Sequence, residues 1–371
     1  MPLTQVQAGL LDTQAQYTGF KNRLINGDMT VDQRNNGAAV TINDTAAYTV
    51  DRWFGEDVTD GAFTVQRISD APVGFSFSSR ITITTADSSL AAGQYAVFVQ
   101  RIEGFNTADF MWGTANAVTV TLSFWTKSSL TGTFGGVVSN GAENYSYPFT
   151  YTISAANTWE YKTVTIVGPT AGTWVGATNG RGLVLGFSLG SGSTFTGPAG
   201  AWVAADDRGG ANGQTNIIGT LNATWQVTGV QIEKGNTATS FDYLPYGTEL
   251  ALCQRYFLPV ALPTDTNSVY SATLFGNASI MLQPLPVQAS MRTTPTVTTI
   301  IGTAVPTFSR YDGTAQQRTV TSLSVSIRNS SNPYFVEVQY TGSGTWGSAN
   351  STGSISWSTG TNSFLNFSAE L

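Results

Sequence analysis

Residues 118–125 read Val-Thr-Val-Thr-Leu-Ser-Phe-Trp, with an apolar residue at every second position and a hydroxyl-bearing residue between. Side chains of a β-strand point alternately to its two faces, so this stretch has one apolar and one polar face. Residues 80–84, Arg-Ile-Thr-Ile-Thr, repeat the pattern. The alternation predicts antiparallel sheets that pack through one apolar face.

Further strands are expected on both sides of this stretch, separated by turns. They are predicted over residues 62–69, 95–102, 158–167, 183–189 and 224–233. The turns are marked by Asn26-Gly27, Asp60-Gly61, Asn140-Gly141, Asn179-Gly180 and Asn212-Gly213, where glycine can take a positive φ at little cost. Many short strands with glycine-rich turns, and no convincing long helix, predict an all-β jelly-roll sandwich.

The alternation breaks at residues 249–257, Glu-Leu-Ala-Leu-Cys-Gln-Arg-Tyr-Phe. Three apolar residues of this stretch share a helical face, which predicts a short helix or turn. We therefore place a domain boundary near residue 247, with the jelly roll over residues 23–247. Residues 248–371 are again rich in strand patterns and are predicted to form a second, smaller β-sandwich.

Residues 1–22 have a different spacing from the rest of the chain. Apolar residues recur there at three- and four-residue steps, the spacing of a heptad, but for fewer than three heptads. The segment is either a tail that packs on the next domain, a docking segment that attaches the protein to a larger assembly, or a short coil among identical chains. The attachment hypothesis assigns the contacts to Leu3, Val6, Leu10 and Leu11.

Composition excludes several classes of protein. The chain has no histidine and one cysteine, Cys253, so catalytic Ser-His-Asp and Cys-His groups, histidine metal sites and an internal disulfide are all excluded. A net charge of −6 argues against a nucleic-acid partner, which needs clustered cations. No stretch reaches the roughly 18 apolar residues of a membrane span, so no membrane insertion is expected. The N-terminus lacks the layout of a secretion signal.

Several stretches resemble a family of bacteriophage virion proteins that have a carbohydrate-binding-like jelly roll. NRLINGDMTVDQRNNG (22–37) and YTVDRW (48–53) are similar to its entry strand, and residues 224–257 to its closing strand and exit segment. MRTTPTVT (291–298) and NSFLNFSAEL (362–371) resemble the small β domain that often follows. LTQVQAGLLDTQA (3–15) is similar to N-terminal segments of phage tail fibres.

The resemblance implies a structural protein of a bacteriophage particle that is not an enzyme. The first expectation is a homotrimeric tail fibre, a receptor-binding protein attached to other virion proteins through residues 1–22. It would contact host cell-surface polysaccharide. One alternative is a head fibre or capsid decoration (cement) protein that stabilises the shell, and another is a polysaccharide-degrading tail spike. The expected location is the virion, on its tail or its capsid surface.

Glycan recognition needs aromatic faces for sugar rings and polar groups for hydroxyls. Large aromatics are more often core or intersubunit packing, which is the competing interpretation for every tryptophan. The tryptophans near turn residues are the better candidates: Trp112, Trp159, Trp174 and Trp202. The polar candidates follow Trp202 in the sequence and are Asp206, Asp207 and Arg208. A second candidate group in the C-terminal domain contains Trp346 and Trp357.

Carboxylates could serve in two further roles. Asp28 near the entry strand and Glu233 or Asp242 near the exit could converge, since first and last strands often meet in jelly rolls. Their oxygens would suit a structural Ca²⁺, and ordinary hydrogen bonding is the alternative; no other cofactor is expected. Glycoside hydrolysis needs two carboxylates about 5–10 Å apart. Adjacent residues such as Asp206 and Asp207 point apart on a strand and would not form such a pair.

Overall fold

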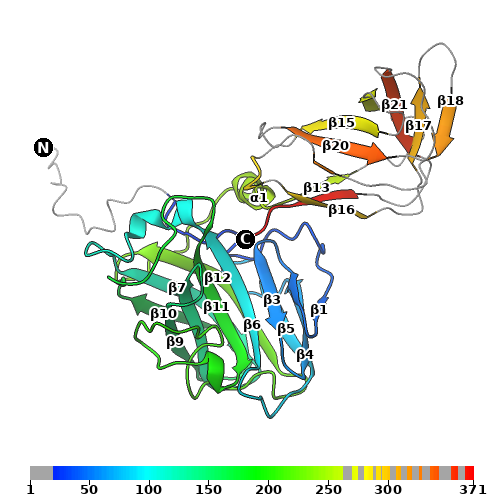
Figure 1. Ribbon diagram of the computed structural model, residues 1–371. Helices are drawn as coiled ribbons and strands as arrows, with labels where there is room; N and C mark the ends of the chain where they lie inside the picture. The colour runs from blue at the N-terminus through cyan, green and yellow to red at the C-terminus, as the bar shows by residue number, and fades with distance from the viewer. Residues whose placement is uncertain are drawn as a thin grey trace, which may run out of the picture. The chain divides into compact units, whose positions relative to one another are not determined.

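The computed structural model describes residues 20–261, 270–274, 280–286, 290–293, 295–300, 306–310, 316–319, 326–327, 335–341, 352–357 and 364–371. The chain divides into two compact units (Figure 1): unit 1 comprises residues 1–249 with Leu371, and unit 2 comprises residues 250–370. The predicted boundary near 247 lies two residues before this division. The proposed attachment residues Leu3, Val6, Leu10 and Leu11 lie outside the described residues.

Unit 1 is built from two six-stranded antiparallel sheets. The first has the order β1 (Val40–Ile42), β4 (Ala62–Ile68), β5 (Ser78–Thr85), β12 (Thr224–Lys234), β7 (Val120–Ser128) and β10 (Glu160–Ile166). The second has the order β2 (Ala46–Tyr48), β3 (Trp53–Asp57), β6 (Tyr95–Glu103), β11 (Arg181–Ser191), β8 (Gly132–Asn140) and β9 (Ser146–Ile153). From β5 to β12 the chain crosses repeatedly between the sheets, and only β8 and β9 are consecutive within one sheet. The predicted jelly-roll β-sandwich is confirmed.

The core lies between the two sheets. Val120, Leu122 and Phe124 of β7, the apolar positions of the alternating stretch, are completely buried. Trp53 of β3 is also completely buried and stacks on Phe98, with ring centroids 5.1 Å apart and planes at 10°. Each such side chain contributes roughly 1.5–3 kcal/mol by leaving water.

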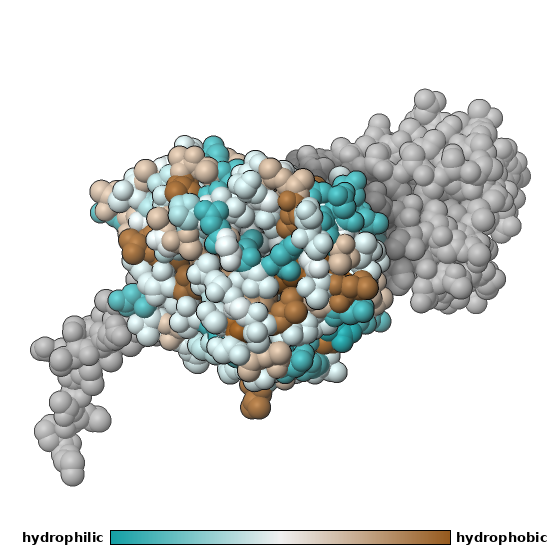
Figure 2. All heavy atoms as spheres, turned by 90° about the horizontal axis from the view of Figure 1, so that it is seen from below, coloured by the Kyte–Doolittle hydropathy of each residue, from teal (hydrophilic) through white to brown (hydrophobic). Residues whose placement is uncertain are grey.

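The polar face of β7 is covered as well. Thr121 and Ser123 are nearly as buried as the apolar residues between them, and the Thr121 hydroxyl donates to the Gly235 carbonyl at 2.8 Å. On the face of unit 1 seen in Figure 2, apolar residues are scattered among polar ones and do not form one continuous patch. Serine and threonine therefore serve as hydrogen-bonded packing residues in this fold as well as surface residues.

The entry segment is held against β12 by backbone hydrogen bonds. Arg23 N–H donates to the Ile232 carbonyl at 3.0 Å, and Val230 N–H donates to the Gly27 carbonyl at 2.9 Å. The predicted turn at Asn26-Gly27 is present, but the positive φ of 58° belongs to Asn26. Gly27 is required for a different reason, because a Cβ there would lie 2.2 Å from the Val230 carbonyl oxygen.

Unit 2 is also strand-rich. It begins within α1 (Tyr246–Gln254), the short helix predicted at this position, in which Cys253 is buried. One antiparallel sheet has the order β13 (Phe257–Ala261), β22 (Phe364–Ser368) and β16 (Thr296–Ile300). The other has the order β18 (Gln316–Thr319), β17 (Pro306–Arg310), β21 (Thr352–Trp357), β14 (Tyr270–Leu274), β15 (Ile280–Pro286), β20 (Phe335–Thr341) and β19 (Ser326–Ile327). In the described part of the chain, no helix is long and apolar enough to cross a membrane.

Candidate functional site

Three of the predicted tryptophans converge on one region of unit 1. Trp112 follows the short helix η4 (Ala108–Phe110), Trp174 precedes β11, and Trp202 follows it. Ring centroids are 5.0 Å apart for Trp112 and Trp174, 5.3 Å for Trp112 and Trp202, and 5.7 Å for Trp174 and Trp202. All three pairs are nearly perpendicular, the edge-to-face arrangement that aromatic rings prefer.

Each indole N–H of this cluster is bonded to a backbone carbonyl of a loop. Trp112 donates to Val118 at 2.8 Å, Trp174 to Ala171 at 3.2 Å, and Trp202 to Val167 at 2.8 Å. Trp112 is only 6% exposed and packs in the core, and it also forms part of the lining of the cavity described below. Trp174 and Trp202 are half-buried, and the Trp202 ring is stacked on Tyr145 with ring centroids 5.5 Å apart and planes at 7°.

Glycines make room for the indoles. A Cβ at Gly113 would lie 2.6 Å from Cδ1 of Trp174, and one at Gly168 would lie 2.8 Å from Nε1 of Trp112. Gly113 also has a φ of 82°, which only glycine adopts without strain. The loops thus bring their backbones against the rings and fix the ring positions.

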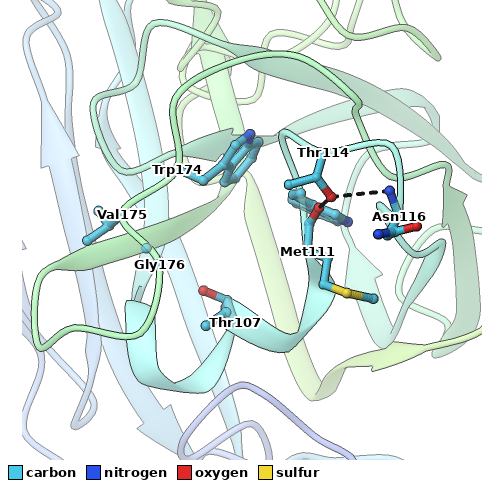
Figure 3. Close-up of a pocket in the computed structure, with 10 residues that line it drawn as sticks. Thr107, Met111, Thr114, Asn116, Trp174, Val175 and Gly176 are labelled. Atoms are coloured by element: carbon cyan, nitrogen blue, oxygen red, sulfur yellow. Dashed lines mark hydrogen bonds between the residues drawn. The ribbon is translucent and has the colours of Figure 1, made fainter.

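A cavity of about 420 Å³ opens beside Trp174 (Figure 3). Its apolar lining includes Trp174, Met111 and Val175, and its polar lining includes Thr107, Thr114 and Asn116. Such a volume lies within the usual range of small-molecule sites, roughly 300–1,000 Å³. No charged residue lines the cavity.

Hydrogen bonds fix the loop that carries Met111. The Thr114 hydroxyl donates to the Met111 carbonyl at 2.6 Å and accepts from the Asn116 backbone N–H at 3.2 Å (Figure 3). The Asn116 side-chain amide makes no hydrogen bond with any other described residue. It remains able both to donate to a ligand and to accept from one.

The fourth tryptophan of the predicted unit 1 set, Trp159, lies elsewhere. It is next to β10 of the first sheet, where its indole N–H donates to Asp70 at 3.4 Å and the Lys127 ammonium lies 5.2 Å from its ring centroid. The hydrogen bond from Lys127 lowers the pKa of Asp70. Sequence reasoning missed its neighbours Trp125 and Tyr161, whose rings are 5.3 Å apart. The sequence did indicate that Trp125 faces outward, because residue 125 continues the series of polar-face positions 119, 121 and 123.

Asp206, Asp207 and Arg208 do not line the cavity. Arg208 donates to Asp206 at 2.6 Å, lies 3.1 Å from Glu143, and stacks over Tyr95 of the second sheet with its guanidinium carbon 5.5 Å from the ring centroid. Asp207 is buried, and burial followed by the charge of Asp206 raises its pKa. The two adjacent carboxyl groups therefore occupy different environments and do not face one sugar site.

The three predicted calcium ligands are engaged in hydrogen bonds of the chain itself. Asp28 accepts from the Thr30 hydroxyl at 2.7 Å, Glu233 from the Thr239 hydroxyl at 2.6 Å, and Asp242 from the Lys21 N–H at 2.6 Å. Within the described ranges, no three such side chains are placed to hold a metal ion. These hydrogen bonds match the alternative interpretation of the three carboxylates.

A carboxylate that sequence reasoning missed lies near two of them. Glu249 accepts a hydrogen bond from the Asn26 backbone N–H. Burial, with added repulsion from Asp28 and Asp242, raises its pKa to about 7. Of the tryptophans predicted in the C-terminal domain, Trp346 lies outside the described residues, and Trp357 is the last residue of β21.

No protein-family model and no curated protein matches this chain. The similar solved structures include a tailspike protein and carbohydrate-binding modules. The enzymatically active domain of bacteriophage CBA120 tailspike protein 4 is 14% identical over 58% of this chain, with a TM-score of 0.30, and the chain spans 21% of that structure. A CBM4 module is 16% identical over 57% of this chain and 98% of its own, with a TM-score of 0.28. TmCBM61 in complex with β-1,4-galactotriose is 11% identical over 58% of this chain and 99% of its own, with a TM-score of 0.28.

Proposed function

We propose that this chain is a glycan-binding structural protein of a bacteriophage particle, and that unit 1 binds sugar in the cavity beside Trp174. The observation that carries the proposal is the cavity itself, which is lined by a half-buried indole and by an exposed amide that has no hydrogen-bond partner among the described residues. A sugar ring has an apolar face, which stacks on an aromatic ring, and hydroxyl edges, which an amide can donate to and accept from.

The rigidity of the loops supports this proposal. The indole-to-carbonyl hydrogen bonds of Trp112 and Trp174 and the Thr114 contacts order the cavity walls before any ligand arrives. A preformed site loses less conformational freedom on binding than a mobile one, so more of the contact energy becomes affinity.

The proposed role on the particle is that of a homotrimeric tail fibre. Residues 1–22 would attach it to other virion proteins, and several copies would engage one host surface together. Weak binding by each copy then yields strong attachment, because the second and third contacts form at a high effective concentration. The proposed location is the virion surface, and a head fibre or decoration protein is the second candidate.

We propose that the chain is not an enzyme. Hydrolysis at the cavity would require a pair of carboxylates flanking the sugar, and its lining contains none. Release of reducing sugar from host polysaccharide by the purified protein would contradict this and support the tail-spike alternative.

The test is binding of the purified full-length protein to host cells and competition with phage. Trp174→Ala should weaken cell binding at least tenfold, whereas the matched variant Trp159→Ala should leave it unchanged. Equal loss in both variants, or none in either, would refute the cavity as the site.

Deletion of residues 2–20 should abolish particle attachment and leave cell binding intact, and imaging of particles would distinguish tail from capsid.

A further inference from the structure

We propose that the cavity beside Trp174 selects an uncharged sugar that carries a methyl group, either in an acetamido substituent or as a 6-deoxy carbon. This inference rests on the proposed glycan binding and specifies which sugars the site accepts. It depends on three properties of the cavity: the absence of charge, the exposed apolar side chains, and the free amide.

The first property concerns charge. No lining residue is charged, and three cations of unit 1 already have acidic partners. Arg181, which precedes the lining residue Gly182, bonds to Glu143 at 2.5 Å, and Arg23 and Lys234 contact Asp109 at 2.9 and 2.7 Å. An acidic sugar would lose hydration on entering the cavity without gaining an ion pair, which is unfavourable. The site therefore discriminates against uronic acids.

The second property concerns the apolar lining. The side chains of Met111 and Val175 are 42% and 41% exposed, although both are apolar and line the cavity. Hydroxyl groups gain nothing from such neighbours, whereas a methyl group would be removed from water against them. Burial of one such carbon is worth roughly 0.8 kcal/mol, which corresponds to about a fourfold change in affinity.

The backbone fixes the position of Met111. Its φ is 53°, in the left-handed region that side chains other than glycine, asparagine and aspartate rarely adopt. The conformation is held by the bond from Met111 N–H to Ala108 at 3.1 Å and by the Thr114 hydroxyl on the Met111 carbonyl. Met111 thus ends η4 in the left-handed conformation that commonly caps a helix, and this fixes the point from which its side chain extends.

The third property concerns the amide of Asn116. It lies across the cavity from Trp174 in Figure 3, on the same side as Met111. A sugar stacked on Trp174 would thus present its substituents to a thioether and an amide together. An acetamido group satisfies both, and a 6-deoxy sugar satisfies the thioether with its methyl and the amide with a ring hydroxyl.

The experiment compares matched sugars by saturation-transfer NMR and titration of tryptophan fluorescence on the full-length protein. The pairs are N-acetyl-D-glucosamine with D-glucose, D-fucose with D-galactose, and D-glucuronate with D-glucose. We expect the methyl-bearing member to bind at least fourfold more tightly in one of the first two pairs, which identifies the source of the methyl group. Glucuronate should bind more weakly than glucose.

The variant Met111→Asn tests the cause of the preference, because asparagine tolerates the left-handed backbone and removes the apolar contact. It should abolish the fourfold preference and keep residual binding that still depends on Trp174. Sugar binding without a methyl preference, or tighter binding of glucuronate, would overturn this inference and leave the proposed function standing. No binding of any sugar, with Trp174→Ala without effect on cells, would overturn both.

Discussion

Trp112 and Trp174 meet edge to face, with ring centroids 5.0 Å apart and planes at 76°, and only Trp112 is fully buried. Both rings line the cavity, but Trp112 is buried in the core of the sandwich, whereas Trp174 is half-buried and exposes more of its surface. Loss of the Trp112 ring should therefore mainly cost stability, and loss of the Trp174 ring should mainly cost ligand binding.

Trp112→Ala should destabilise unit 1 by about 3–5 kcal/mol, because it removes a large buried side chain and leaves a cavity. Trp174→Ala should cost roughly 1–2 kcal/mol of stability, since its ring is only half-buried. It should nevertheless weaken sugar binding more than Trp112→Ala does, relative to the stability that each variant loses. Urea unfolding followed by fluorescence and sugar titration measure the two effects. Equal stability losses would contradict the assignment.

Gly113→Ala should move Trp174. The substitution adds strain at a φ of 82° and places a methyl group 2.6 Å from the indole, so we expect a loss of roughly 2–4 kcal/mol and a changed near-ultraviolet circular dichroism spectrum. Gly213→Ala is the control. Its φ of 74° imposes similar backbone strain, but nothing lies within 4 Å of the added Cβ. The loss of stability in this variant should therefore reflect the backbone strain alone.

Gly27→Ala should loosen the entry segment from β12. The added Cβ would lie 2.2 Å from the Val230 carbonyl oxygen, so the backbone must shift, at a cost of at least about 2 kcal/mol. Gly93→Ala, where nothing lies within 4 Å, should change stability by less than about 0.5 kcal/mol. Similar unfolding midpoints for the two variants would show that the close approach at Gly27 is unimportant.

Unit 1 should lose stability as the pH rises from about 4.5 to 7. Burial raises the pKa of Glu249 to about 7 and that of Asp51 to about 6, so the folded chain binds more protons than the unfolded chain in this window. Stability then falls with increasing pH, and Glu249 alone should account for roughly 1–3 kcal/mol. Glu249→Gln should flatten this dependence in urea titrations at several pH values.

Glu160 provides the opposite control for that pH series. Burial acts to raise its pKa, but the hydrogen bonds from Lys162, Ala155 and Ser154 prevail and hold the pKa below its usual value. Its contribution to stability should therefore disappear as the pH falls through this lowered pKa. If Glu160→Gln and Glu249→Gln changed the pH dependence of the unfolding free energy in the same direction, the raised pKa of Glu249 and the lowered pKa of Glu160 would both be contradicted.

Much of the fold could be predicted from residues close together in the sequence. The alternation over residues 118–125 predicted both the strand β7 and its buried face, and it also contained the outward position of Trp125. It could not predict that Thr121 would be covered, because that depends on the Gly235 carbonyl more than a hundred residues later. Local periodicity specifies a face, whereas distant segments decide what lies against it.

The candidate site was predictable only as a set of residue types. Tryptophans near turns were recognisable, but three of them converge and Trp159 does not, because loop closure brings residues 112, 174 and 202 together. The role of Arg208 was hidden for the same reason, since its partner Glu143 lies on a different loop. Met111 carried no sequence signal, because its place in the cavity wall depends on a loop that lies more than sixty residues before Trp174.

The first and last segments of unit 1 lie beside each other. Lys21 N–H donates to Asp242 at 2.6 Å, and Asn26 N–H donates to Glu249. Tension applied to the chain before residue 20 and after residue 249 therefore passes through a few hydrogen bonds between these segments. Among the strands, β12 is bonded directly to the entry segment, so such tension would load these contacts and the edge of β12 before the other strands.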